Sequence, residues 1–181
     1  ISALILILTA CSSKAPSAFT KVDKVPTVFP DYTNITVPCN IAPMNFLIDQ
    51  EADRYLTVLE SESGKVSIKG KKVCIPRSKW QALTRSPQIT VSVYTRNKGQ
   101  WSAYSPFSIN VSDEIDPFIS YRIIMPSVEC YERLSINERD LTSFSEKVIY
   151  SNEMVQVTDK GQCINCHHYR NYGTDNMQFH A

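Results

Sequence analysis

The chain of 181 residues is poor in glycine, nearly neutral overall and free of long hydrophobic runs. Its five glycines stand against ten prolines, nine tyrosines and seven phenylalanines, a balance that disfavours a glycine-rich repeat and favours β-strands separated by turns. The net charge of +1 gives no reason to expect a nucleic acid partner. The apolar run at residues 3–8 is far below the roughly 20 residues that a helix needs to span a bilayer.

Catalytic signatures are missing as well. The sequence contains no Ser-His-Asp set, paired-carboxylate pattern or phosphate-binding loop, so a hydrolase or a kinase is not expected. The length allows one domain with a substantial core and a smaller appendage. Because the chain does not begin with Met and stops directly after a stretch rich in ligand side chains, we interpret it as the N-terminal part of a longer protein.

The first residues have the pattern of an export signal. Residues 1–10 would be the remnant of a signal peptide, and Leu8-Thr9-Ala10-Cys11 matches a bacterial lipobox, in which the cysteine thiol receives the lipid. Residues 11–30 would then comprise the lipidated Cys11 and a flexible tether. The alternative is a buried strand that ends in an ordinary cysteine. No Asp follows Cys11, which favours a lipid anchor in the outer membrane, with the protein facing the periplasm.

Residues 31–112 predict a mainly β domain. Apolar and polar residues alternate at 55–59, 65–69, 89–94 and 107–112, and turn residues occupy 61–64 and 97–100. Short strands at this spacing favour an antiparallel sandwich of the immunoglobulin or fibronectin III type.

One helix is expected at residues 77–83, directly after a proline and with Ser78 as its cap. Trp80 and Leu83 lie three residues apart and would pack the helix on the sheet. Trp80, Trp101 and the tyrosines could instead form a carbohydrate-binding face, although packing in the core and at the sheet edges is the favoured interpretation.

Two further segments follow the sandwich. Residues 113–152 predict a connecting region, with a strand at 117–124 and a short helix or packed loop at 137–144. Residues 153–181 predict a short irregular or helical segment, which contains the residues with the clearest chemistry.

That chemistry is c-type haem attachment at Cys163-Ile164-Asn165-Cys166-His167. Cys163 and Cys166 would form thioether bonds to the vinyl groups of one porphyrin, and His167 would be the proximal iron ligand. With six cysteines and three histidines in the chain, an accidental match has a chance of roughly three in a thousand. Haem attachment occurs outside the cytoplasm, so this motif and the export signal point to one compartment.

Two other interpretations of the motif stay open. Cys163, Cys166, His167 and His168 are all zinc ligands by type. The two cysteines could also form a redox dithiol or a disulfide, although the βαβ context of a thioredoxin-like motif is not predicted here.

The sixth iron ligand is a separate question. His168 is too close to His167 to reach the opposite side of the same haem. His180 is the preferred distal ligand and Met177 is the alternative, and an open sixth position would allow a small molecule to bind. A pair of histidines would give a lower reduction potential than a His/Met pair.

Three other cysteines remain, and in an exported protein they should not all be free. Cys39 and Cys74 border predicted strands and could form a disulfide. Cys130 would then be left over.

Eight stretches of the chain match one family of bacterial proteins, at residues 30–32, 37–46, 101–107, 115–117, 121–124, 138–144, 163–167 and 177–180. On these stretches the chain resembles bacterial TolB-like lipoproteins with a CxxCH haem motif, loosely labelled cytochrome c biosynthesis proteins. The sequence departs from that family at Cys39, where proline is usual, and at His168, where a small residue is usual. The resemblance implies a covalent haem c and a β-propeller after the haem segment.

Two functions of different classes are consistent with these features. The first is a periplasm-facing lipoprotein that carries one haem c for electron transfer or redox sensing, with a redox partner in the envelope. The second is an accessory module of the envelope that binds glycans or proteins, in which the CxxCH site is structural and holds haem or zinc.

Overall fold

The computed structural model describes residues 15–124, 134–152, 154, 166–173 and 175–180. The chain divides into two compact units, residues 1–115 and 116–181, and we describe each unit by itself. The signal remnant, Cys11, Cys130 and Cys163 lie outside the described residues. No helix in the described part of the chain is long and apolar enough to span a membrane.

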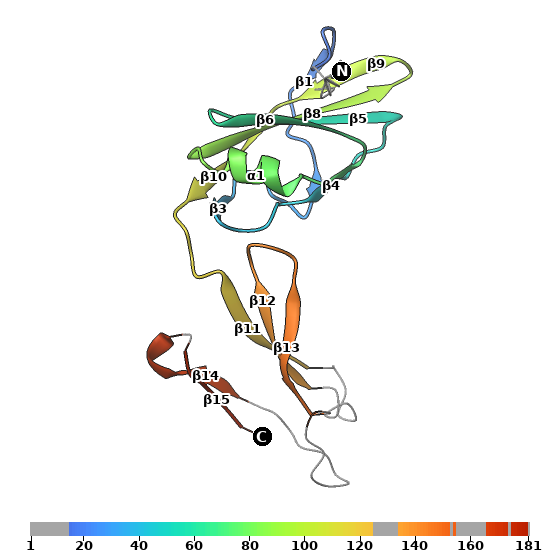
Figure 1. Cartoon of the computed structure of the whole chain (residues 1–181). Coiled ribbons are helices and arrows are strands. Elements are labelled where there is room, and N and C mark those ends of the chain that lie inside the picture. Colours follow the sequence, from blue (N-terminus) through green and yellow to red (C-terminus); the bar gives the residue numbers. More distant parts are fainter. Residues whose placement is uncertain (1–14, 125–133, 153, 155–165, 174, 181) are drawn as a thin grey trace, which may run out of the picture. The chain divides into compact units, whose positions relative to one another are not determined.

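The first unit contains a sheet of seven strands (Figure 1). These strands are β1 (Thr20–Val22), β3 (Thr36–Pro38), β5 (Arg54–Ser61), β6 (Gly64–Lys69), β8 (Gln88–Asn97), β9 (Gln100–Tyr104) and β10 (Phe107–Ser112). The long strand β8 is central: it pairs antiparallel with β5 on one side, and with β9 and β10 on the other. Strand β6 extends the sheet beyond β5, whereas β1 and β3 add in parallel beside β9 and β10.

A second sheet completes a sandwich. Its strands are β2 (Val28–Phe29), β4 (Phe46–Ile48) and β7 (Lys72–Val73), in the order β2-β4-β7. Alternate residues of the central strand β8, namely Ile89, Val91 and Val93, are buried and join one core cluster with Phe46 and Ile48 of the second sheet. This burial confirms the predicted mainly β sandwich, because apolar faces of both sheets supply one core.

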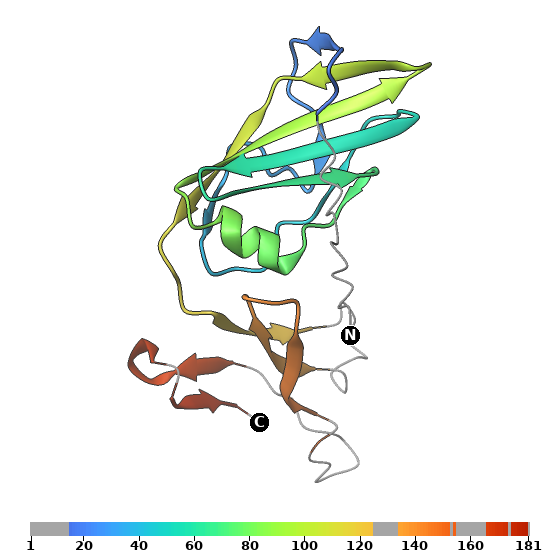
Figure 2. The ribbon, with the colours of Figure 1, turned by 45° about the horizontal axis from the view of Figure 1, so that its top comes forward.

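The single helix of the described first unit, α1 (Arg77–Leu83), lies along one face of the larger sheet, as the turned view in Figure 2 also shows. Its range is the predicted one, and Trp80 and Leu83 are buried as expected. The prediction that Ser78 caps the helix is wrong. Pro76 occupies the cap position, and its carbonyl oxygen accepts the backbone N–H groups of Lys79 and Trp80, so Ser78 lies inside the first turn.

The predicted flexible tether, residues 11–30, needs correction in its second half. Strand β1 pairs with β9, and strand β2 pairs with β4, so both belong to the sandwich. The Phe19 ring, just before β1, meets the Tyr94 ring edge-on at 5.8 Å. These contacts order a segment whose composition predicted a linker.

The second unit begins with an antiparallel sheet of three strands, β11 (Phe118–Ile123), β12 (Ser135–Asp140) and β13 (Glu146–Ser151). Strand β11 confirms the predicted strand at 117–124. The short helix or packed loop predicted at 137–144 is wrong in its first half, since residues 137–140 belong to the middle strand. A turn follows, in which the Asp140 carboxylate accepts the N–H of Thr142 at 2.8 Å.

A hairpin ends the described chain. Strand β14 (His167–Tyr169) pairs antiparallel with β15 (Met177–Phe179), and the 3-10 turn η2 (Arg170–Tyr172) lies between them. The segment predicted to be irregular or helical is therefore mainly a β-hairpin where it is described. Phe179 contacts Tyr150 of β13, with 5.0 Å between the ring centroids.

Candidate functional site

The candidate site lies at the open end of the β14–β15 hairpin. The strand register places His167 opposite Phe179 and His168 opposite Gln178. One step further, the backbone N–H of His180 donates to the carbonyl oxygen of Cys166 at 3.1 Å. The hairpin therefore brings Cys166 and His180 together, although 14 positions separate them in the sequence.

The two faces of the hairpin differ in exposure. His167, Tyr169, Met177 and Phe179 are half-buried, whereas the intervening residues His168 and Gln178 are exposed. Successive side chains of a strand point to opposite faces, which accounts for this alternation. Phe179 packs on Tyr150, so the half-buried face is the one toward the β11–β13 sheet.

An open hollow of about 230 Å³ lies at the same end of the hairpin. Its lining residues are Cys166, His167, His168, Gln178, Phe179 and His180. Three predicted site residues thus border one hollow: the second haem-attachment cysteine, the proximal ligand and the preferred distal ligand. Met177 shares the half-buried face with His167 but is not among the residues that line the hollow.

These residues fit a haem in kind and in place. A thiol and an imidazole are the groups that attach and ligate haem c, and Cys166 and His167 border the same space. The hollow is smaller than the roughly 300–1,000 Å³ of an enclosing ligand pocket. The hollow would therefore enclose only part of a haem.

The described residues support a bare metal ion, such as zinc, less well than they support a haem. Within the described residues, no three His, Cys, Asp or Glu side chains are placed to hold an ion. His167 and His168 alternate in exposure along β14, although both border the hollow. The zinc interpretation would need Cys163, which lies outside the described residues.

The predicted disulfide between Cys39 and Cys74 is not present in the structure, where both are free cysteines. Each residue does border a strand, as expected: Cys39 follows β3 and Cys74 follows β7. These strands belong to different sheets, and the N–H of Cys39 donates to the carbonyl oxygen of Ser112 within the larger sheet. The two cysteines thus follow strands of separate sheets.

The two tryptophans have different places. Trp80 is fully buried, and its indole N–H donates to the carbonyl oxygen of Ile41 at 2.9 Å, so the packing interpretation is confirmed for this residue. Trp101 is half-exposed on β9 and carries the Arg96 guanidinium over its ring at 5.9 Å. The neighbours of Trp101 were not predictable from composition, because Phe19 lies in a segment with the composition of a tether.

A polar cluster in the second unit was also missed. The Tyr121 hydroxyl and the Asn137 amide donate to the Glu146 carboxylate, the latter at 2.6 Å. The hydrogen bond from Tyr121, followed in size of effect by the one from Asn137, holds the pKa of Glu146 below its usual value. The hydrogen bond to the same carboxylate raises the pKa of Tyr121. These residues join three strands of one sheet, so a structural role accounts for them.

No family model, no curated protein and no solved structure matches this chain. The relation to TolB-like lipoproteins therefore stays a prediction from the matching stretches of sequence.

Proposed function

We propose that this chain is a lipoprotein of the bacterial envelope that carries one covalent haem c and transfers single electrons. The observation that carries the proposal is the convergence of Cys166, His167 and His180 on one hollow at the end of a hairpin. Cys163 completes the attachment motif in the sequence. Anchoring through Cys11, in the outer membrane and facing the periplasm, belongs to the same proposal.

Each residue has a defined task in this proposal. The Cys163 and Cys166 thiols would form the thioether bonds to the vinyl groups of the haem, and His167 would hold its iron. His180 is the preferred distal ligand because it borders the hollow, whereas Met177 does not. The bound haem supplies a one-electron couple, Fe(III) to Fe(II), whose potential depends on the distal ligand and on solvent exposure.

The packing of Phe179 on Tyr150 gives the hairpin a support from the neighbouring sheet. A supported hairpin would hold Cys166 and His167 in place for the haem. An open hollow would leave a bound haem accessible to a redox partner, which suits electron transfer better than chemistry that must exclude water.

The test is expression of the chain with a cytochrome c maturation system, followed by intact mass and a pyridine haemochrome spectrum. We expect one haem per chain, lost in the double variant Cys163→Ala/Cys166→Ala. The matched control, Cys39→Ala/Cys74→Ala, should retain haem because these cysteines lie in the sandwich. A haem-free product from cells that mature a control cytochrome would reject the proposal.

The distal ligand is tested on the same preparation. His180→Ala should convert the ferric iron from low to high spin, whereas Met177→Leu should leave the spectrum unchanged. The reverse result would assign Met177 instead. An unchanged low-spin spectrum in both variants would remove both residues from the coordination sphere.

A further inference from the structure

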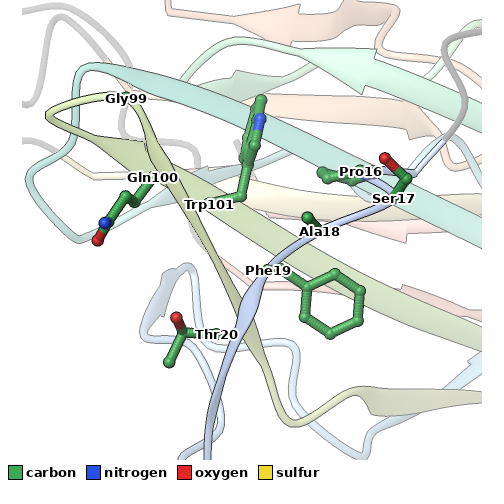
Figure 3. Close-up of a pocket in the computed structure, with 8 residues that line it drawn as sticks. All are labelled: Pro16, Ser17, Ala18, Phe19, Thr20, Gly99, Gln100 and Trp101. Atoms are coloured by element: carbon green, nitrogen blue, oxygen red, sulfur yellow. The ribbon is translucent and has the colours of Figure 1, made fainter.

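A second site lies in the sandwich, where β1 runs parallel to β9 (Figure 3). The register pairs Thr20 with Ser102, which places Phe19 level with Trp101. On the other side of β9, Trp101 pairs with Arg96 of β8. Thr95, which precedes Arg96 in β8, is buried and therefore points to the inner face of the sheet. Arg96, Trp101 and Phe19 thus share the outer face.

Two hollows open beside these strands. The first has a volume of about 590 Å³, and its lining includes Pro16, Ser17, Phe19, Gln100 and Trp101. The second, of about 490 Å³, shares Phe19 with the first and continues past Tyr94. Each volume is in the range of known ligand sites, and the shared phenyl ring makes them neighbouring parts of one groove.

The aromatic rings of this groove are held in place by the protein itself. The Arg96 guanidinium lies over the Trp101 ring, and its Nε donates to the carbonyl oxygen of Gly99 at 3.0 Å. Phe19 meets Tyr94 edge-on yet stays 42% exposed. A ligand would therefore meet rings that are already ordered, which lowers the entropy cost of binding.

The chemistry of the first hollow is neutral. Its described lining residues carry no charged side chain; they offer hydroxyl groups from Ser17 and Thr20 and an amide from Gln100. Figure 3 shows Thr20 and Gln100 pointing to one side of the paired strands and Phe19 to the other. In the second hollow, Lys21 and Asp23 add one positive and one negative charge, which balance.

We propose that this groove binds an uncharged oligosaccharide. The C–H faces of pyranose rings would stack on Trp101 and Phe19, because these hydrogens carry partial positive charge and the ring faces are negative. On the face that carries Phe19, the sugar hydroxyls would exchange hydrogen bonds with the hydroxyl groups of Ser92 and Tyr94, each of which both donates and accepts.

The experiment is calorimetry on the full chain with three soluble neutral probes, cellohexaose, maltohexaose and mannohexaose. Tryptophan emission gives a second readout, since the chain has two tryptophans and Trp80 is buried. We expect at least one probe to bind and to shift the emission of Trp101. Trp101→Ala and Phe19→Ala should each weaken binding by about tenfold or more, whereas Trp101→Phe should retain most of the affinity.

The matched control is Phe144→Ala, which removes another exposed phenyl ring, from the second unit, and should leave the affinity unchanged. Circular dichroism of each variant shows whether it has folded.

The proposal is overturned if no neutral probe binds at millimolar concentration, or if binding survives both alanine variants. Preferential binding of hexagalacturonic acid or of decaproline would also overturn it, in favour of an anionic glycan or a proline-rich peptide. Loss of haem through Cys163→Ala/Cys166→Ala is expected to leave saccharide affinity intact, because the groove residues all lie in the first unit.

Discussion

Replacing Trp80 with phenylalanine tests how the helix is attached to the sandwich. The indole of Trp80 is fully buried, and its N–H donates to the carbonyl oxygen of Ile41 at 2.9 Å. Phenylalanine cannot form this bond, which costs about 1 kcal/mol. The smaller ring also leaves a void of about 40 Å³, which at ~24 cal/mol per Å³ costs about 1 kcal/mol more. We expect the free energy of unfolding of the first unit to fall by about 2 kcal/mol.

Urea denaturation followed by circular dichroism measures this loss, and thermal unfolding should show a fall in Tm of about 10 °C. The matched control is Trp101→Phe, because Trp101 is half-exposed and its N–H carries no such bond in the described structure. This control should change the stability by less than about 0.5 kcal/mol. Equal losses in the two variants would refute the reasoning, since burial and the Ile41 bond would then not decide the outcome.

Three other predictions concern local features. The hydrogen bonds from Tyr121 and Asn137 lower the pKa of Glu146, so the stability that the Glu146 carboxylate contributes is present at neutral pH and lost as pH falls through its folded-state pKa. Glu146→Gln should therefore abolish this loss of stability in β12 at acid pH. Amide exchange at several pH values measures it. Gly99→Ala should destabilise the β8–β9 turn by about 1 kcal/mol in urea denaturation, because Gly99 has φ +85°. Alkylation without reduction should label Cys39 and Cys74, with Cys74 reacting faster because it is more exposed.

Each of these has a result that would contradict it. An acid-side slope that persists in Glu146→Gln would assign it to another carboxylate. Gly64→Ala is the control for Gly99→Ala, because a Cβ there meets its nearest neighbour at an ordinary 3.6 Å; equal losses would reject the strain argument. A peptide pair linked through Cys39 and Cys74 would contradict the free cysteines of the structure and support the sequence-based disulfide.

The sandwich was predictable from sequence where its strands are long enough to show a period. Strand β8 has ten residues, with alternate side chains buried in the core, so its pattern is unambiguous. The turn at residues 97–100 was equally clear, because a glycine follows Lys98 and both adopt positive φ. Strands β2 and β7 have two residues each, which is too short for any period. They exist because β4 lies between them and supplies their hydrogen bonds.

Strand β12 was mispredicted for a different reason. Its sequence, Ser-Ile-Asn-Glu-Arg-Asp, has one apolar residue in six and includes good helix formers, so it does not alternate as a half-buried strand should. Its neighbours decide its conformation. Strands β11 and β13 pair with it on both sides, and Ile136 is fully buried in this unit.

In the candidate haem site, the local sequence supplies the side chains, whereas strand pairing decides which of them lie close together. The donor types at Cys166, His167 and His180 are evident from the sequence, but their convergence depends on the register of β14 with β15. Adjacent residues such as His167 and His168 project to opposite faces of a strand, whereas His180 returns to Cys166 because the hairpin reverses the chain. A change that shifted this register by one residue would exchange the faces of β15 and break the backbone bond from His180 to Cys166, although every residue of the motif stayed in place. Haem attachment through Cys163, Cys166 and His167 should therefore survive such a shift, while coordination by His180 should not.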